Sequence, residues 1–131
     1  MAEYTPPPTY TPGPAKPGKV QAIAIMVLIN GILNILWALG ASAGALFSLI
    51  GIFCVPITIL PGVLGIFEIL YASNLLSSAP KPNQNGQTIA ILEIACILAG
   101  NVVSLVVGIL VLVFASDPEV KDWFARLGPT V

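Results

Sequence analysis

The sequence predicts an all-α integral membrane protein, with a four-helix transmembrane bundle, a disordered proline-rich N-terminal tail and a short C-terminal interfacial helix. Of its 131 residues, 56% are hydrophobic and only 8% are charged, and the mean hydropathy is +0.95. Soluble domains carry about a quarter charged residues. The apolar runs between residues 20 and 115 leave room for several spans of about 20 residues each. We therefore divide the chain into a tail (1–19), a bundle (20–115) and a C-terminal segment (116–131).

The composition also excludes several classes of function. The net charge is −1 and no Lys/Arg-rich patch is present, which argues against nucleic acid as a partner. The chain has no histidine, and Cys54 and Cys96 each lie in an apolar run without a neighbouring metal ligand. We expect both cysteines to behave as small buried hydrophobes. The sequence thus predicts a protein that is not an enzyme, needs no cofactor or metal, and has the lipid bilayer as its main partner.

The tail holds six of the twelve prolines and the short tandem "YTPPP" and "YTPGP". Proline fixes φ and removes a backbone donor, so we expect disorder or polyproline II here. Two interpretations stay open: a solvated leader, or a docking tail for a protein partner with an aromatic groove. The first apolar run is about 20 residues long, against roughly 7 to 15 for a signal-peptide core, so it should stay in the mature protein.

The first span is predicted at residues 20–39, with Trp37 near its end as an interfacial aromatic. Asn30 and Asn34 lie four residues apart and share a helix face. Within a bilayer such amides commonly hydrogen-bond to a neighbouring helix. The small residues "GASAG" at 40–44 indicate either a turn or a close helix crossing.

The second apolar block, residues 42–76, is longer than one span and contains Pro56 and Pro61. It is either two short spans, or one kinked span after a re-entrant segment. A polar loop at 77–87 follows. The last block, 88–115, is long for one span and short for two. A break is possible at Gly100-Asn101, where a tight hairpin would form.

The positive-inside rule selects among these topologies. If the second block crosses once and the last block forms a hairpin, all basic residues fall on one side of the membrane. These residues are Lys16, Lys19, Lys81, Lys121 and Arg126. The sequence therefore predicts four crossings with both termini cytoplasmic.

Weak self-similarity supports the same topology. "GIFEILYAS" from Gly65 matches "GILVLVFAS" from Gly108, and "QAIAI" from Gln21 matches "QTIAI" from Gln87. Such matches are typical of a two-span unit duplicated in parallel. The first copy would then carry an insertion around residues 40–60.

The segment "SDPEVKDWFARLG" predicts a further helix, with Ser116 or Asp117 as its cap and Pro118 at its first position. Its apolar stripe has spacing i, i+3, i+4, i+7 and consists of Val120, Trp123, Phe124 and Leu127. Such a helix should lie in the headgroup plane, with Trp123 and Phe124 as interfacial anchors.

Three segments carry a resemblance to a known group of proteins. "INGILNILWALG", "LPGVLGIFEILYASNLL" and "VGILVLVFASDPEVKDWF" together resemble small, uncharacterised bacterial four-span membrane proteins whose last span runs into a "PEVKxWF"-like or "PEVKxYF"-like segment. The resemblance covers about residues 20–125. It implies four helices and a prokaryotic inner (cell) membrane location, and it carries over no catalytic residue.

Two glutamates in apolar runs, Glu68 and Glu93, are the most unusual residues of the chain. Insertion scales put the cost of an ionised Asp at a helix centre at roughly 2.5 to 3.5 kcal/mol. If residues 77–87 form a hairpin loop, both carboxyl groups reach similar depth and lie close together. Protonation, a bound cation or hydrogen bonds would then compensate. The candidate intramembrane polar site consists of Glu68, Glu93, Asn30, Asn34 and Asn101.

Gly100, Ser104 and Gly108 repeat at small-xxx-small spacing and predict a helix-packing seam rather than a pore. The seam would serve either the bundle of one chain or a homo-oligomer. For function, the sequence favours a non-enzymatic structural or interaction protein of the membrane. The alternative is a small ion or proton transporter or channel that uses the two intramembrane glutamates.

Overall fold

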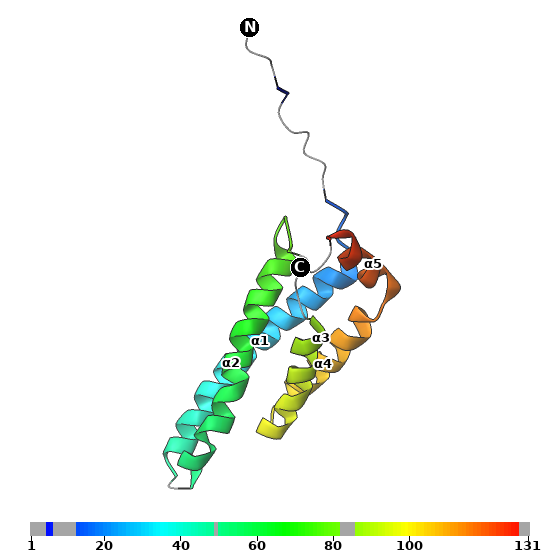
Figure 1. Ribbon diagram of the computed structural model, residues 1–131. Coiled ribbons are helices and arrows are strands. Elements are labelled where there is room, and N and C mark those ends of the chain that lie inside the picture. Colours follow the sequence, from blue (N-terminus) through cyan, green and yellow to red (C-terminus); the bar gives the residue numbers. More distant parts are fainter. Residues whose placement is uncertain (1–4, 7–12, 49, 82–85, 129–131) are drawn as a thin grey trace.

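The computed structural model describes residues 5–6, 13–48, 50–81 and 86–128, and this part of the chain is helical with no strand. Two antiparallel helical hairpins lie side by side (Figure 1). The first consists of α1 (Gly18–Leu46), the 3-10 turn η1 (Gly51–Cys54) and α2 (Val55–Leu76). The second consists of α3 (Gly86–Ala95), η2 (Cys96–Ala99) and α4 (Val102–Ala115), and α5 (Pro118–Arg126) follows it. The predicted all-α class is confirmed.

Helix α1 is longer than predicted. It has 29 residues, which corresponds to about 43 Å, and it continues through the "GASAG" segment to Leu46. A Cβ atom added to Gly40 or Gly44 would have no atom within 4 Å. The expectation of a turn at residues 40–44 was therefore wrong. The contact of this segment with a neighbouring helix is made instead by Ser42, whose hydroxyl hydrogen-bonds to that of Thr58 on α2 at 2.9 Å. The chain instead reverses direction between Leu46 and Gly51.

The second apolar block, residues 42–76, is divided between the end of α1, η1 and one long helix, α2. Pro56 lies in the first turn of α2, where its missing N–H costs nothing, and Pro61 is buried inside the helix. Together with η1, α2 forms one apolar segment, Gly51–Leu76, that is long enough to cross a membrane once. Of the two interpretations of this block, two short spans are thereby excluded.

The second hairpin turns at the predicted break. Gly100 has φ +78°, in the left-handed region that favours glycine, and Asn101 caps α4 by accepting a hydrogen bond from the Ser104 backbone N–H at 3.2 Å. Gly86–Ala99 and α4 have 14 residues each, about 21 Å, against about 30 Å of bilayer hydrocarbon. Among the described residues, two helices are long and apolar enough to cross a membrane. A third is added if α4 and α5, bent by 74°, form one span.

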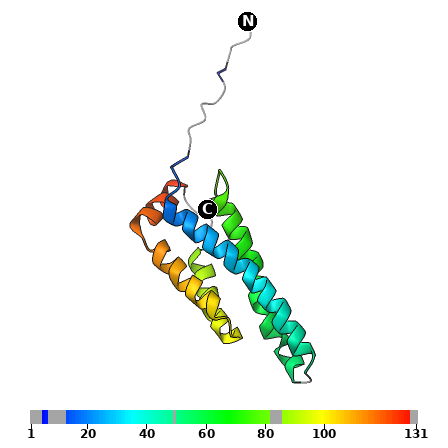
Figure 2. The ribbon, with the colours of Figure 1, turned by 180° about the vertical axis from the view of Figure 1, so that it is seen from behind.

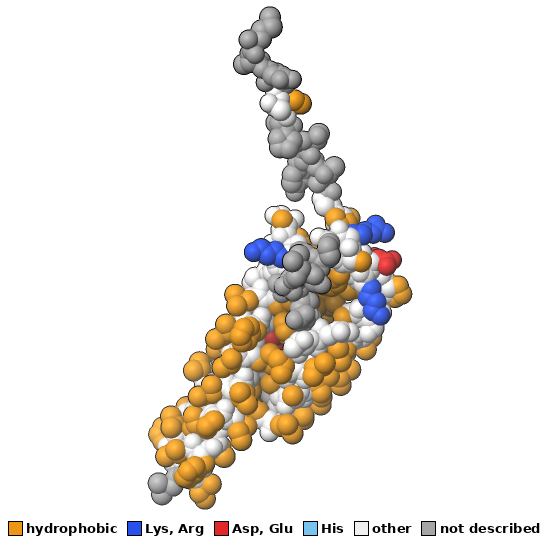
Figure 3. Space-filling view, viewed as in Figure 1, with side chains coloured by type: hydrophobic (Ala, Val, Ile, Leu, Met, Phe, Trp, Pro, Cys, Tyr) orange, Lys and Arg blue, Asp and Glu red, His pale blue; other side chains and the backbone are white. Residues whose placement is uncertain are grey.

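The first and the last helix of the chain, α1 and α5, meet at one end of the molecule. The start of α1, the end of α2, the start of α3 and all of α5 lie there, and we call this the terminal end (Figures 1 and 2). The opposite end of the α1–α2 hairpin extends beyond the turn at Gly100 (Figures 1 and 2). Basic side chains gather at the terminal end, and hydrophobic side chains cover most of the remaining surface (Figure 3).

Each hairpin has one close backbone crossing at a small residue. A Cβ atom on Gly65 would lie 2.5 Å from the carbonyl oxygen of Gly31, and one on Gly108 would lie 2.6 Å from that of Ala90. Gly65 and Gly108 therefore occupy equivalent places, as their sequence match indicated. The match of Gln21 with Gln87 was wrong, because Gln21 lies ten residues before Gly31 whereas Gln87 lies three before Ala90.

Substitution of Gly65 tests the crossing of the first hairpin. Gly65→Val would push its side chain into the backbone of α1, and overpacking of this kind costs about 1–3 kcal/mol or more. We expect a lower thermal midpoint of the detergent-solubilised protein by circular dichroism. Gly40→Val, in open space on α1, is the matched control and should leave the midpoint unchanged. Equal midpoints for the two variants would contradict the close crossing.

Candidate functional site

A cluster of polar side chains is buried where the two hairpins meet. Its members are Asn30, Asn34, Glu68, Glu93, Asn101 and Ser104. Asn101 is 6% exposed and the others are 1% exposed or less. The cluster contains all five residues of the predicted intramembrane site, together with the central residue of the predicted seam.

The crossing of α1 and α2 positions the first pair of polar residues. Asn34 and Glu68 each follow a crossing glycine, Gly31 or Gly65, by three residues, which brings them to the same side of the contact. The Asn34 side-chain amide donates to both carboxylate oxygens of Glu68, at 2.9 and 3.0 Å. Asn30 donates to Oε1 of Glu68 at 3.3 Å. These donors replace the water that the Glu68 carboxylate would lose on burial.

Helix α4 binds to this pair from the second hairpin. Asn101 Nδ2 donates to the Asn34 side-chain oxygen at 2.5 Å, and the Ser104 hydroxyl donates to the same oxygen at 2.7 Å. Asn30 also donates to the Ser104 hydroxyl at 3.1 Å. Both asparagines of α1 therefore donate to Glu68, and they hold α4 through the side-chain oxygen of Asn34 and an N–H group of Asn30.

Glu93 completes the cluster from α3 but has no hydrogen-bond partner of its own. Both of its carboxyl oxygens are buried, and neither is within hydrogen-bond reach of a donor among the described residues. The Glu68 carboxyl and the Asn30 amide lie close enough to interact with its carboxyl. Opposite Glu93, in the place that Glu68 has in the first hairpin, stands Val111, three residues after Gly108. The structure thus places the two predicted glutamates in the same cluster, and of the two only Glu68 accepts hydrogen bonds from the described residues.

The predicted seam is used inside the bundle. Gly108 packs on α3, Ser104 hydrogen-bonds to α1, and Gly100 lies beside Trp37, whose ring would be 3.8 Å from an added Cβ. All three positions therefore contact neighbouring helices of the same chain. Of the two uses that the sequence left open, the structure supports packing within one bundle.

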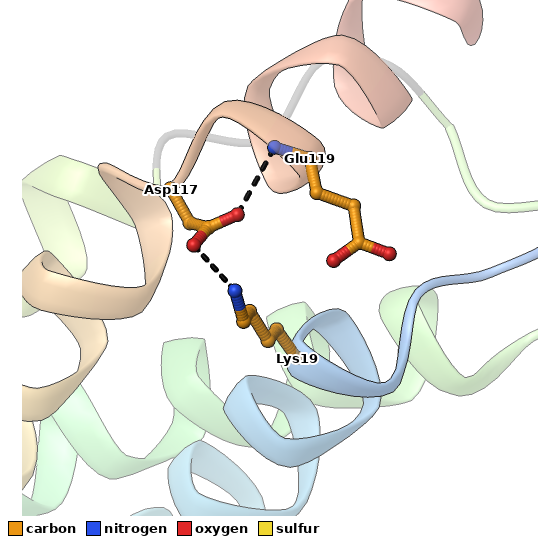
Figure 4. A network of polar contacts seen from close by, with 3 residues as sticks. All are labelled: Lys19, Asp117 and Glu119. Atoms are coloured by element: carbon orange, nitrogen blue, oxygen red, sulfur yellow. Dashed lines mark hydrogen bonds and ion pairs between the residues drawn. The ribbon is translucent and has the colours of Figure 1, made fainter.

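At the terminal end, α5 is held by a second, more exposed set of polar contacts. Asp117 caps α5 by accepting from the Glu119 backbone N–H at 3.0 Å, and it forms an ion pair with Lys19 of α1 (Figure 4). The predicted helix and its cap are confirmed, with Asp117 rather than Ser116 in the capping role. Lys16 donates to the backbone oxygens of Leu75 and Ser77, so the segment before α1 is also held against α2.

The apolar stripe of α5 faces the protein more than we expected. Val120 and Trp123 are buried, and the Trp123 indole N–H donates to the Pro14 carbonyl oxygen at 3.3 Å. Phe124 is half-buried and stacks edge-on against Trp123, with ring centroids 5.0 Å apart. Anchoring of α5 in lipid therefore stays a prediction, in which Phe124 is the more accessible of the two aromatic rings.

Sequence reasoning missed the crossing glycines of the first hairpin. The signal that would have found them is a small residue three positions before a polar one on three of the four bundle helices. These pairs are Gly31 and Asn34, Gly65 and Glu68, and Ala90 and Glu93. The spacing places each polar side chain just beyond a point where two backbones touch. The contact between Trp123 and Pro14 had no comparable signal, since it joins residues 109 positions apart.

The cluster supplies amide, hydroxyl and carboxyl groups. The described residues contain no group of three or more His, Cys, Asp or Glu side chains that could hold a metal ion. Both cysteines are free thiols, and Cys96 is buried as expected. The expectation was wrong for Cys54, which is exposed because it lies in η1 at the far end of the first hairpin. The chemistry that this arrangement supports is the holding of hydrogen bonds and protons within an apolar bundle.

No protein-family model, curated protein or solved structure matches this chain. What the protein does must therefore be inferred from its own residues.

The ion pair at the terminal end predicts an acid-sensitive contact. The hydrogen bond from Lys19, helped by the backbone N–H groups of Glu119 and Val120, holds the pKa of the Asp117 carboxyl below its usual value of 3.8. A lowered folded-state pKa stabilises the folded state above the usual value, and this stabilisation is lost as the pH falls through the lowered pKa. We expect Trp123 fluorescence, in a Trp37→Phe background, to report release of α5 only below about pH 4.

Two substitutions separate the ion pair from the cap. Asp117→Asn keeps a capping side chain but removes the charge, so the acid step at this contact should disappear while α5 stays helical. Asp117→Ala removes both and should loosen α5 at neutral pH as well. An unchanged acid step in Asp117→Asn would show that another group controls the release.

Proposed function

We propose that this chain is a non-enzymatic structural or interaction protein of the membrane, whose bundle is a platform and whose terminal end contacts other proteins. The observation that carries this proposal is the assembly of the terminal end. The segment before α1, the end of α2 and all of α5 are tied together there by Lys16, Lys19 and Trp123. Charged side chains gather at this end of the bundle, and hydrophobic side chains cover most of the rest of the face in view (Figure 3).

The apolar surface supports integration in a bilayer. Large hydrophobic side chains are exposed along α1, α2 and α4, including Leu36 at 59% and Leu60 at 61%. Burial of so many of these side chains requires lipid or another apolar partner. Because the basic residues lie at the terminal end, the positive-inside rule supports cytoplasmic termini. The resemblance of the sequence to bacterial proteins supports a prokaryotic inner membrane.

Four crossings are part of the same proposal. The turn at Gly100 lies beside Trp37, which is 17 residues beyond Val20, or about 26 Å along α1. Tryptophan prefers the membrane interface, so a turn at this depth is close to the far side of the bilayer. The short arms of the second hairpin would then be accommodated by local thinning of the bilayer. The end of the first hairpin would extend beyond the second, where the inserted segment was predicted.

Cysteine labelling tests the four crossings. Leu98 is 87% exposed and lies at the turn of the second hairpin. In a Cys54→Ser, Cys96→Ser background, we expect Leu98→Cys to react with a membrane-impermeant maleimide added outside intact cells. Lys81→Cys, in the loop between the hairpins, should react only after the cells are opened. A Cys96→Ser variant that keeps the exposed native Cys54 is the positive control for outside access. If Cys54 reacts and Leu98→Cys does not, the second hairpin is re-entrant and the four-span topology is wrong.

The proline-rich tail is proposed as one of the contact segments. Residues 1–4 and 7–12, which include parts of both repeats of its tandem, lie outside the described residues. Pro14 and Lys16 fix the point at which the tail leaves the bundle. A tail that starts from a fixed surface is available to a protein partner with an aromatic groove.

A second candidate function is favoured by one observation, the unpartnered carboxyl group of Glu93. Buried ionisable groups without partners commonly mark ion or proton pathways in membrane proteins. On this alternative, the protein is a small ion or proton transporter or channel, and Glu68 and Glu93 form the coupling site.

Flux measurements distinguish the two functions. In proteoliposomes, we expect the wild type, Glu68→Gln and Glu93→Gln to show no proton or cation flux above that of protein-free vesicles. A wild-type flux that both variants lose would replace the platform with the transporter. For the platform itself, photo-crosslinking from position 121 on α5 should capture a protein partner in cells. Crosslinking from position 98 at the turn is the matched control. An identical pattern after deletion of residues 2–15 would argue against a role of the tail.

A further inference from the structure

Glu68 and Glu93 are neighbours with opposite hydrogen-bonding environments. Both side chains are fully buried. Glu68 accepts three hydrogen bonds from the amides of Asn30 and Asn34. Glu93 accepts none from the described residues, and the groups that interact with its carboxyl are the Glu68 carboxyl and the Asn30 amide. A buried carboxyl group without a donor is costly, and two adjacent buried carboxylates are more costly still.

We propose that Glu68 and Glu93 bind one proton between them, with Glu93 as the donor and Glu68 as the acceptor, and that this proton attaches the second hairpin to the first. The bond would be an O–H···O⁻ hydrogen bond, which is short and roughly twice as strong as a neutral one. It satisfies one buried oxygen of Glu93 and leaves a single negative charge on the pair.

The hydrogen bonds indicate which carboxyl group carries the proton. Every contact that Glu68 receives from an asparagine comes from an N–H donor, and an ionised carboxylate is an acceptor only. The negative charge is therefore best placed on Glu68. Glu93 faces Val111 across its own hairpin, which offers neither donor nor charge, so a neutral Glu93 fits its surroundings.

The same contacts favour a proton over a metal cation. A hard cation needs several oxygens that converge on one point. The side-chain oxygen of Asn34 instead accepts from Asn101 and Ser104, on the side of α4. Asn34 turns its N–H group toward the pair. The pair is therefore lined by donors, which stabilise a shared negative charge.

Few other titratable groups face the pair. On α2, Tyr71 lies one turn beyond Glu68, and Cys96 of η2 lies near both carboxyl groups. Helix α3 has no titratable residue besides Glu93, and α4 has none. The single charged residue of α1, Lys19, is engaged with Asp117 at the terminal end. No positive charge of these helices is therefore available to neutralise a second carboxylate.

The terminal end offers a polar approach to the pair. A pocket of about 320 Å³ opens there and is lined by Tyr71, Gln87, Thr88 and Lys121 among others. Glu93 lies five residues further along α3 than Thr88, about 7.5 Å at about 1.5 Å per residue. On the opposite side, the groove between α2 and η2 is lined by apolar residues and Cys96. Exchange of the proton should therefore occur with the terminal side.

The shared proton gives the bundle a response to alkaline pH. Asn34 joins α1 to α4, whereas the two glutamates join α2 to α3. Loss of the proton would leave two adjacent negative charges at the α2–α3 contact and would weaken it, while the contact between α1 and α4 persists. This inference does not rest on the platform function, since a proton can be held without being transported.

Infrared spectroscopy of the protein in lipid nanodiscs tests the pair directly. With glutamate labelled by ¹³C, the wild type should show a protonated-carboxyl band at neutral pH that disappears as the pH is raised. Glu93→Gln should lose this band and its pH response. Asp122→Asn, at an exposed carboxylate of α5, is the matched control and should keep both. Absence of the band in the folded wild type, or its persistence in Glu93→Gln, would overturn the proposal.

Stability measurements provide a second readout. The thermal midpoint of the wild type should fall at alkaline pH, whereas that of Glu93→Gln should not, because glutamine donates an N–H to Glu68 without titrating. Glu68→Gln should show a smaller alkaline fall than the wild type, since loss of the Glu93 proton then creates one buried charge rather than two adjacent ones. If Glu93→Gln does not fold, the comparison of Glu68→Gln with the wild type decides the matter. Equal alkaline destabilisation of the wild type and Glu68→Gln would contradict the shared proton.

Discussion

The hydrogen bonds between Asn34 and Glu68 are the interaction on which the rest of the bundle depends. A carboxylate inside an apolar helix is tolerated only where donors surround it, and Asn34 supplies donors to both of its oxygens. The same side chain accepts from Asn101 and Ser104 of α4. One amide therefore fixes the partner of α2 and the position of the second hairpin. In a bundle core whose other side chains are mostly apolar and pack with little directionality, these bonds help to specify the register.

The crossing glycines make this interaction reachable. Asparagine and glutamate side chains meet directly across two helices only where the backbones come close, and Gly31 and Gly65 allow such an approach. The polar residue follows the small one by three positions, which is close to one helical turn. The small residue thus sets a short distance between the helices, and the polar residue three positions later forms the hydrogen bonds that this distance allows.

The sequence predicted the parts of the structure that carry strong local signals. Gly100-Asn101 marked the turn, Asp117 and Pro118 marked the start of α5, and the isolated polar residues marked the cluster. The length of α1 was not predictable, because Gly and Ala at 40–44 fit a membrane helix as well as a turn. The sequence also could not predict which asparagine donates a hydrogen bond to which glutamate, since those partners depend on where the helices cross. The repeat was recognised at Gly65 and Gly108, but apolar similarity shifted its other half by two turns.

The departure from this repeat explains why the two hairpins form one unit. In the first hairpin the positions after the crossing are Asn34 and Glu68, which satisfy each other. In the second they are Glu93 and Val111, so the acid has no partner within its own hairpin. A hairpin with an unsatisfied buried carboxyl group is unstable alone in lipid. With a proton shared between Glu93 and Glu68, as we propose, Glu93 has its partner on the first hairpin. The second hairpin then depends on the first, because Val111 stands where the first hairpin has Glu68.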